Sequence, residues 1–257
     1  MNIIIITGAS SGIGKEFALQ LDQYFPHTDE FWLISRRENK LKELSEALNH
    51  KSRLFTLDIT KEDSLDTLAQ ALYDSNARVR MLVNCAGFGM MGAFMEQSSD
   101  CASSMIRLNC EALTTITHCV IPYMQRNGRI IQMASCASFL PQPDFAVYAA
   151  TKAYVLSFSR ALREELKPMN LWVTAVCPGP VDTPFFDIAE KYGSTLAIKK
   201  YTIVDAGRVV RKALRDSANR KSLSVCSFPI KGVHFLSKAL PHDFIMSCMN
   251  LMKKKGL

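Results

Sequence analysis

Apolar residues along this chain fall into two patterns, short continuous runs and longer segments with helical spacing. The runs are four to six residues long and often β-branched, at residues 3–6, 31–35, 53–57, 79–84, 129–133 and 172–176. Segments of helical periodicity lie between or after them, at residues 15–24, 38–49, 62–75, 98–126 and 149–166. Continuous runs are typical of parallel strands buried on both faces. The alternation predicts an α/β fold, a doubly wound parallel sheet with right-handed crossovers and helices on both faces.

Nothing in the sequence marks a boundary between domains, because no Pro-, Gly- or Ser-rich tract, low-complexity segment or repeat occurs. A chain of 257 residues with 48% apolar content can bury one large core, so we expect a single domain over residues 1–257.

The start of the chain lacks the basic and apolar regions of a secretory signal, and no run of about 18 apolar residues occurs. We expect a cytoplasmic protein without a spanning helix.

The eight cysteines show neither a C-x-x-C pair nor zinc-ligand spacing. Several lie inside apolar runs, where free thiols pack as small hydrophobic groups. The sequence therefore predicts reduced cysteines and no metal site.

Positive charge is concentrated in the last fifth of the chain. The whole chain carries a net charge of +7, whereas residues 206–257 hold eleven Lys or Arg against two Asp. No nucleic-acid-binding motif accompanies this charge, so no nucleic-acid partner is expected. A helical tail is expected over residues 231–257, with apolar residues at helical spacing before Lys253–Lys255, namely Phe244, Ile245, Cys248, Met249 and Met252. It is either a core or dimer helix, or a lid or interfacial helix whose lysines contact anionic lipid.

A glycine-rich turn follows the first strand directly. The segment Thr7–Gly14 contains Gly8, Gly12 and Gly14 and leads into an amphipathic helix. Glycines let the backbone approach a pyrophosphate, whose charge is stabilised at the positive end of the helix. The order strand, glycine turn, helix therefore predicts a dinucleotide site.

The second strand ends in Ser35-Arg36-Arg37, without an acidic residue at positions 34–37. An acid at this strand end would bind the adenosine ribose hydroxyls, whereas arginine accommodates a 2′-phosphate. This favours NADP(H) as the cofactor, although a surface arginine pair opening the next helix is the alternative. Asp58, at the end of the third strand, is either a cofactor contact or the cap of a short turn.

Tyr148 and Lys152 lie four residues apart on the helix expected at the fifth crossover. Residues with this spacing are neighbours on one helix face, so the ammonium is expected to lower the pKa of the phenol. The pair alone also fits a helix carrying a half-buried Tyr and a solvated Lys. Asn109 lies inside a predicted helix, where Asn is unfavourable unless it faces solvent or its amide is needed.

Together these motifs resemble the short-chain dehydrogenase/reductase family. The matching elements are Thr7-Gly8-x-x-x-Gly12-x-Gly14, Asn84-x-Ala86-Gly87, Asn109, Ser135, Tyr148-x-x-x-Lys152 and Pro178-Gly179. They occur in the family's order and cover residues 1 to about 185. The resemblance implies a Rossmann-type sheet of about seven strands, the last near residues 223–229, and hydride transfer between NADP(H) and a small carbonyl or alcohol substrate.

The resemblance also assigns roles to residues. Tyr148 would donate a proton to the carbonyl oxygen, Lys152 would hold the nicotinamide ribose, Ser135 would orient the carbonyl, and Asn109 would hold a water. The cofactor would contact Gly8, Ser10, Ser11, Gly12, Ile13, Gly14, Arg36, Arg37, Asp58, Ile59, Asn84, Ala86, Gly87, Tyr148, Lys152, Pro178, Gly179, Val181 and Thr183. A homo-dimer or tetramer is expected.

The sequence departs from the common family pattern at three places. Cys85 replaces a second Asn, Cys136 follows Ser135 and is expected to be packed, and the tail resembles loosely those of hydroxysteroid and 3-oxoacyl reductases. Residues 183–205 are expected to form an apolar substrate lid with Phe185, Phe186, Tyr192, Leu196 and Ile198. A non-catalytic NADP(H)-binding sensor or scaffold is the alternative to an enzyme.

Overall fold

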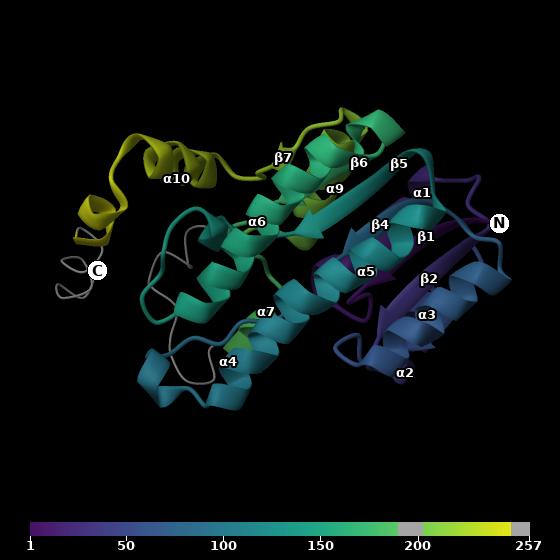
Figure 1. Ribbon diagram of the computed structural model, residues 1–257, viewed down its shortest axis with the longest axis horizontal. Coiled ribbons are helices and arrows are strands. Elements are labelled where there is room, and N and C mark those ends of the chain that lie inside the picture. Colours follow the sequence, from purple (N-terminus) through teal and green to yellow (C-terminus); the bar gives the residue numbers. More distant parts are fainter. Residues whose placement is uncertain (190–202, 248–257) are drawn as a thin grey trace.

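Seven parallel strands form one sheet in the order β3-β2-β1-β4-β5-β6-β7 (Figure 1). The structure is a computed structural model and describes residues 1–189 and 203–247. The strands are β1 (Asn2–Thr7), β2 (Glu30–Ser35), β3 (Ser52–Thr56), β4 (Arg78–Asn84), β5 (Met124–Met133), β6 (Trp172–Val176) and β7 (Leu223–Ser224). The order runs outward from β1 and β4 in opposite directions, which confirms the predicted doubly wound, Rossmann-like α/β fold.

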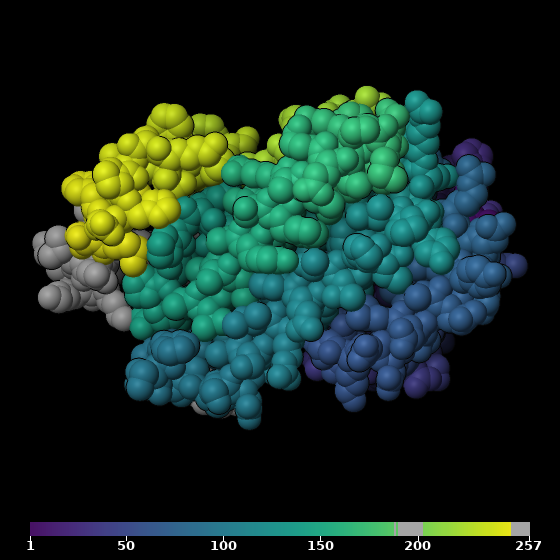
Figure 2. All heavy atoms as spheres, viewed as in Figure 1, coloured from purple at the N-terminus to yellow at the C-terminus, as the bar shows by residue number. Residues whose placement is uncertain are grey.

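Helices cover both faces of the sheet. One face is covered by α1 (Gly12–Tyr24), α2 (Glu38–Glu46) and α9 (Ala206–Ala218), and the other by α3 (Glu62–Asp74), α5 (Leu113–Val120) and α6 (Ala146–Leu166). Three shorter or peripheral helices are α4 (Ser99–Ile106), α7 (Phe185–Ala189) and α10 (Phe228–Ala239). Figure 2 shows α10 and the turn after it as a lobe projecting at one end of the molecule.

The strand β1 shows why the apolar runs are continuous. Its residues Ile3 to Ile6 are fully buried, with Ile3 and Ile5 packing in one core cluster and Ile4 and Ile6 in the other. Successive side chains of a strand point to opposite faces, so a sheet covered on both sides needs apolar residues at every position. Burial of each isoleucine contributes about 1.5–3 kcal/mol before entropic costs.

The helix predicted over residues 98–126 is wrong in its length and regularity. It is interrupted by a π-helical segment, Arg107–Ala112, and α5 ends at Val120. A 3₁₀ turn with Pro122 follows, and β5 begins at Met124, five residues before the expected strand. Proline lacks the N–H that would continue a helix, and a prediction from apolar periodicity does not take this into account.

The C-terminal part also differs from expectation. The seventh strand holds only Leu223 and Ser224, because the chain turns into α10 with Pro229 in its first turn, where the missing N–H has no cost. A helical tail was predicted over residues 231–257, and residues 248–257 of this range lie outside the described part. Among residues 1–189 and 203–247, no helix is both long and apolar enough to cross a bilayer.

Residues 203–205 return to the sheet edge beside the loop after β6. Val181 and Val204 form a parallel bridge, in which Val204 N donates to Pro180 O at 3.0 Å and Asp182 N donates to Val204 O at 3.1 Å. Both ends of the predicted lid are therefore fixed at one place. Residues 190–202, with Tyr192, Leu196 and Ile198, lie outside the described residues.

Candidate active site

The predicted site residues gather at one edge of the sheet, because they follow the carboxyl ends of parallel strands. Two hydrogen bonds tie neighbouring loops together there. Ala86 N donates to Thr7 Oγ1 at 3.2 Å, and Cys136 N donates to Pro178 O at 2.8 Å. The first bond joins the end of β1 to the loop after β4, and the second joins the loops after β5 and β6.

The glycine turn between β1 and α1 has no room for side chains. Gly8 has φ +67°, and a Cβ there would lie 2.7 Å from Ala86 N; a Cβ on Gly14 would lie 2.3 Å from Gly8 O. Gly12 also has positive φ, and its Cβ would meet Thr183 Cγ2 at 3.2 Å. The loop after β6 therefore faces the glycine turn directly.

The start of α1 is suited to an anion. Its first turn holds no acidic residue, and the Ser11 side chain does not cap it. The first N–H groups of the helix are therefore available to an external acceptor, and the bare glycine backbone allows a close approach. These features fit the pyrophosphate of a dinucleotide.

Of the two predicted arginines, Arg37 is the one that reaches the glycine turn. Its Nη2 donates to Ser10 Oγ at 2.8 Å and to Ser11 Oγ at 2.6 Å. Arg36 instead lies close enough to Asp58 to influence its carboxylate. Burial opposes ionisation of Asp58, but hydrogen bonds from Thr60 and the charge of Arg36 outweigh it, so the pKa of Asp58 is lowered.

Asp58 forms a local turn, the alternative considered above. Its Oδ1 accepts from Thr60 N at 3.1 Å and from Thr60 Oγ1 at 2.7 Å. The neighbouring Ile59 is buried in the core, as is Val181, while Ile13 is partly buried against the core. These three apolar side chains pack against the core.

Ser135, Tyr148 and Lys152 come together behind this surface. Ser135 and Tyr148 are hydrogen-bonded through their side chains. Lys152 Nζ donates to Met133 O at 2.7 Å and lies 5.7 Å from the centre of the Tyr148 ring. All three are buried, with exposed fractions of 9%, 7% and 5%. The spacing of four residues on α6 does make Tyr148 and Lys152 neighbours.

The expected lowering of the Tyr148 pKa is wrong. Burial raises the pKa of the phenol well above its usual value, and the hydrogen bond with Ser135 opposes this only in part. Burial also lowers the pKa of Lys152 to about 8. Burial removes water from both the Tyr148 phenolate and the Lys152 ammonium. This cost exceeds the favourable interaction between the two charges.

Asn109 is fully buried, and both polar atoms of its side-chain amide are hydrogen-bonded. Its Nδ2 donates to Phe88 O at 2.8 Å and to Thr151 Oγ1 at 3.0 Å, and its Oδ1 accepts from Phe88 N at 3.1 Å. It therefore joins the loop after β4 to α6. The π-helical segment that contains it was not foreseen; such segments are frequent at functional sites.

Gly87 lies in the space between this amide and Lys152. A Cβ on Gly87 would lie 2.9 Å from Asn109 Oδ1 and 3.4 Å from Lys152 Nζ. Asn84, in contrast, points into the protein, where its Nδ2 donates to Thr117 Oγ1 and Gln132 Oε1, each at 3.0 Å. Its side chain holds α5 against the sheet instead of lining the site. The sequence did not indicate Thr117, Gln132 or Thr151 as partners.

An apolar cluster surrounds Tyr148, and sequence reasoning missed most of it. The Tyr148 ring stacks on Phe145 with centres 4.2 Å apart and lies 5.5 Å from Phe185. A Cβ on Gly89 would lie only 2.6 Å from Tyr148 Cδ2. The other members are mainly methionine and phenylalanine side chains, including Met90, Met91, Met105 and Phe88. Gly89 is the sequence feature that indicates close packing here, but it lies outside the family motif Asn84-x-Ala86-Gly87.

The cysteines near the site are packed thiols. Cys136 is only partly exposed, and burial raises its pKa; burial raises the pKa of Cys177 to about 12. Thiols with raised pKa are poor nucleophiles at neutral pH. All seven cysteines of the described ranges are free, and those ranges contain no cluster of potential metal ligands.

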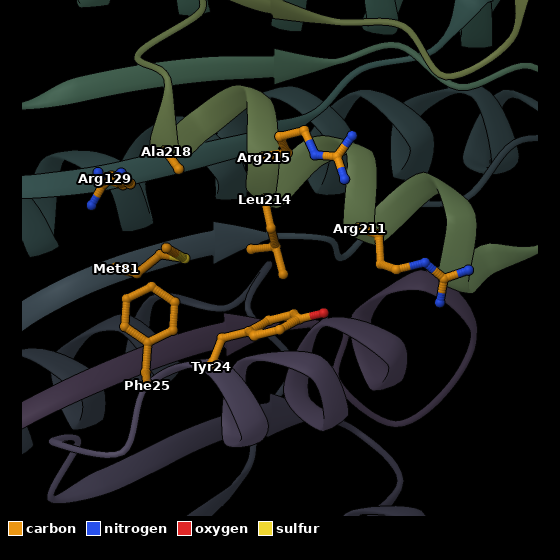
Figure 3. A pocket seen from close by; sticks show the side chains of 8 residues that line it. All are labelled: Tyr24, Phe25, Met81, Arg129, Arg211, Leu214, Arg215 and Ala218. Carbon is orange, nitrogen blue, oxygen red and sulfur yellow. The ribbon is translucent and has the colours of Figure 1, made fainter.

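A separate cavity of about 440 Å³ lies between α1 and α9, on the sheet face that these helices cover (Figure 3). Aromatic and apolar side chains line it, and Arg211 and Arg215 extend from α9 on one side while Arg129 lies on the other. Its lining is Tyr24, Phe25, Met81, Arg129, Arg211, Leu214, Arg215 and Ala218. None of the predicted catalytic residues lies in it.

Comparison with known proteins identifies the family of this chain. Residues 2–192 match the short chain dehydrogenase family. An uncharacterised oxidoreductase of Staphylococcus epidermidis is 30% identical over 206 residues, covering 79% of this chain and 88% of that protein. The 3-oxoacyl-(acyl-carrier-protein) reductase FabG of Thermotoga maritima is 29% identical, covering 71% and 75%.

Among solved structures, a short-chain dehydrogenase from Sphingobium yanoikuyae in complex with NADPH superposes with a TM-score of 0.77. It is 27% identical, and the match covers 89% of each chain. With the family match over most of its length, the chain belongs to the short-chain dehydrogenase family and is an oxidoreductase. The C-terminal part beyond residue 192 lies outside the family match.

Proposed function

We propose that the protein transfers a hydride between NADP(H) and a carbonyl or secondary alcohol on a small, apolar substrate. The observation that carries this proposal is the convergence of Ser135, Tyr148 and Lys152 in one buried place, with Gly87 close to Lys152. The arrangement provides a proton donor, a hydrogen-bonding partner for it and a buried cation.

In this proposal the bound nicotinamide supplies the hydride. The Tyr148 hydroxyl donates its proton to the carbonyl oxygen, and Ser135 orients that oxygen. The raised pKa keeps the Tyr148 phenol protonated at neutral pH, so that it has a proton to donate when a carbonyl is reduced. Lys152 holds the ribose through its ammonium, and Asn109 keeps the loop at Gly87 and Phe88 in place against α6.

The preference for NADP(H) over NAD(H) rests on Arg37. Its guanidinium lies over Ser10 and Ser11, beside the turn that would hold the cofactor phosphates. A guanidinium binds a phosphate through paired, charge-assisted hydrogen bonds. Arg36 adds a second positive charge at the same strand end. The NADPH complex of the Sphingobium yanoikuyae relative supports the assignment.

The apolar cluster around Tyr148 supports an apolar substrate. Met90, Phe145 and Phe185 surround the proposed proton donor with side chains that cannot hydrogen-bond a polar substrate. Reduction of a 3-oxoacyl group by the Thermotoga maritima relative is consistent with this class. A non-catalytic sensor is less consistent with the site, because binding alone would not require a buried Ser, Tyr and Lys together.

We further propose that the protein is cytoplasmic and forms a homo-dimer or tetramer. Light scattering of the purified protein tests the oligomeric state.

The test is Tyr148→Phe, assayed by NADPH consumption with a panel of ketones. Reduction should fall at least about a hundredfold, the scale of a lost general acid, while NADPH still binds. Tyr154→Phe is the matched control, because Tyr154 lies on the same helix, is 42% exposed and contacts Thr114 instead. Near-normal turnover by Tyr148→Phe would exclude Tyr148 from the mechanism.

A further inference from the structure

The outer face of α10 is an exposed apolar stripe. Phe228 is 86% exposed, Phe235 71% and Leu236 49%. Phe228 and Phe235 are seven residues apart and so lie on one side of the helix. Gly232 lies between them, and nothing comes within 4 Å of a Cβ placed there. Leu240, which follows the last residue of α10, and Phe244, beyond Pro241, are also exposed, by 38% and 58%.

The inner face of α10 fixes the helix to the edge of the sheet that carries the site. Ile230 is buried and lies against Gly179, where a Cβ would be 3.0 Å from it. The His234 ring packs on Phe139 with centres 4.3 Å apart, just after the turn that begins at Ser135. The stripe is therefore the outward side of a docked helix. Figure 1 shows α10 beyond the carboxyl end of β5.

The charge along α10 itself has one sign, and Asp243 is the first acidic residue after its end. Lys231 and Lys238 are exposed on α10, and residues 228–240 contain no acidic side chain. Within residues 1–189 and 203–247, neither lysine forms an ion pair. An apolar stripe flanked by unpaired lysines is the arrangement of helices that lie in the surface of an anionic bilayer.

We propose that α10 docks the enzyme on an anionic lipid surface, with Phe228 and Phe235 inserted among the headgroups. A second copy of the chain fits less well, because a two-fold contact through this stripe would bring the lysines of both copies together without an acid between them. Docking would turn the edge with Ser135 and Tyr148 towards the lipid. Resting on the proposed function, this makes a lipid-dissolved carbonyl compound the substrate class.

The test is co-sedimentation of the full chain with vesicles of phosphatidylcholine alone or with about one third phosphatidylglycerol. Wild type should bind the anionic vesicles, and added salt should weaken binding because it screens the lysines. The variant Phe228→Ser/Phe235→Ser should lose at least about tenfold in affinity, since it removes most of the insertable apolar area. Lys231→Gln/Lys238→Gln should lose affinity only for the anionic vesicles.

Arg211→Gln/Arg215→Gln is the matched control. It removes two exposed positive charges that line the α1–α9 cavity (Figure 3) and belong to α9, not to α10. Its vesicle affinity should stay within about twofold of wild type, whereas an equal loss in both double-charge variants would mean non-specific attraction and refute docking through α10. Thermal melting of each variant shows that it is folded; exposed positions are expected to leave the melting temperature unchanged.

Two further outcomes would overturn the proposal. One is unchanged vesicle binding by Phe228→Ser/Phe235→Ser. The other is a fall in its oligomeric mass without any vesicle binding by wild type, which would show that a second copy covers the stripe. Tyr148→Phe should bind vesicles like wild type, so an error in the proposed chemistry would not imitate an error in docking. Turnover of a small soluble ketone should be the same in the stripe variant and wild type.

Discussion

Gly89→Ala tests whether the position of Tyr148 determines the rate. Gly89 lies so close to the proposed proton donor that no side chain fits between them. A Cβ added at Gly89 would lie 2.6 Å from Tyr148 Cδ2 and 2.9 Å from Phe145 Cζ. The backbone at Gly89 does not require glycine, since the glycines with positive φ are Gly8, Gly12 and Gly92 among the described residues. The substitution therefore acts through steric contact alone.

The size of the effect follows from these distances. Carbon atoms in contact lie about 3.5–4.0 Å apart, so the Tyr148 ring must move by about 1 Å. The stacked Phe145 restricts the direction of this movement, because the ring centres are already 4.2 Å apart. A misplacement of about 1 Å can lower a rate about a hundredfold. We expect kcat to fall by roughly ten- to a hundredfold, with unchanged NADPH affinity.

The assay compares kcat, NADPH affinity and melting temperature in Gly89→Ala and Gly232→Ala. Gly232 has no atom near its added Cβ and lies within α10, where alanine favours the helix by about 0.5–1 kcal/mol. The control should therefore keep wild-type kcat. Wild-type kcat in Gly89→Ala would refute the reasoning, since Tyr148 would either tolerate the shift or not contribute to the rate. Activity should be measured well below the melting temperature, because overpacking costs about 1–3 kcal/mol.

Two further predictions concern charge. Arg37→Ala should weaken NADPH far more than NADH, because its guanidinium lies at the glycine turn, and Arg36→Ala should have a smaller effect; equal losses for both cofactors, measured by fluorescence titration, would contradict the NADP(H) assignment. Lys152 has a folded-state pKa lowered to about 8, so the unfolded state binds more protons between about pH 8 and its ordinary value of 10.5. The stability of wild type relative to Lys152→Met should therefore rise with pH across that window, and a flat difference in melting temperature would show that burial does not lower the pKa of Lys152.

Sequence reasoning was most successful where the physical signal is local. The continuous apolar run at Ile3–Ile6 predicted a strand covered on both faces, and the glycines after it predicted the turn into α1. The spacing of Tyr148 and Lys152 predicted their proximity, because it depends only on helix geometry. The interruption of the long helix before Asn109 has no such periodic signal.

The failures arise where burial and tertiary packing decide the result. The pKa of Tyr148 depends on how completely α6 is covered, which no pair spacing reveals. Similarly, Asn84 matched a family motif, yet its side chain is used to hold Thr117 and Gln132 inside the protein. Whether Arg36 or Arg37 reaches the glycine turn depends on the direction of the chain after β2.

The Val181–Val204 bridge has a consequence for how this enzyme can change over evolution. Because the bridge joins the two ends of the segment between β6 and α9, insertions or deletions inside that segment leave the sheet register and the position of α9 intact. Doubling the length of a closed flexible loop costs only about 0.6 kcal/mol. The length of the segment can therefore change during evolution without moving the residues proposed to carry out the chemistry.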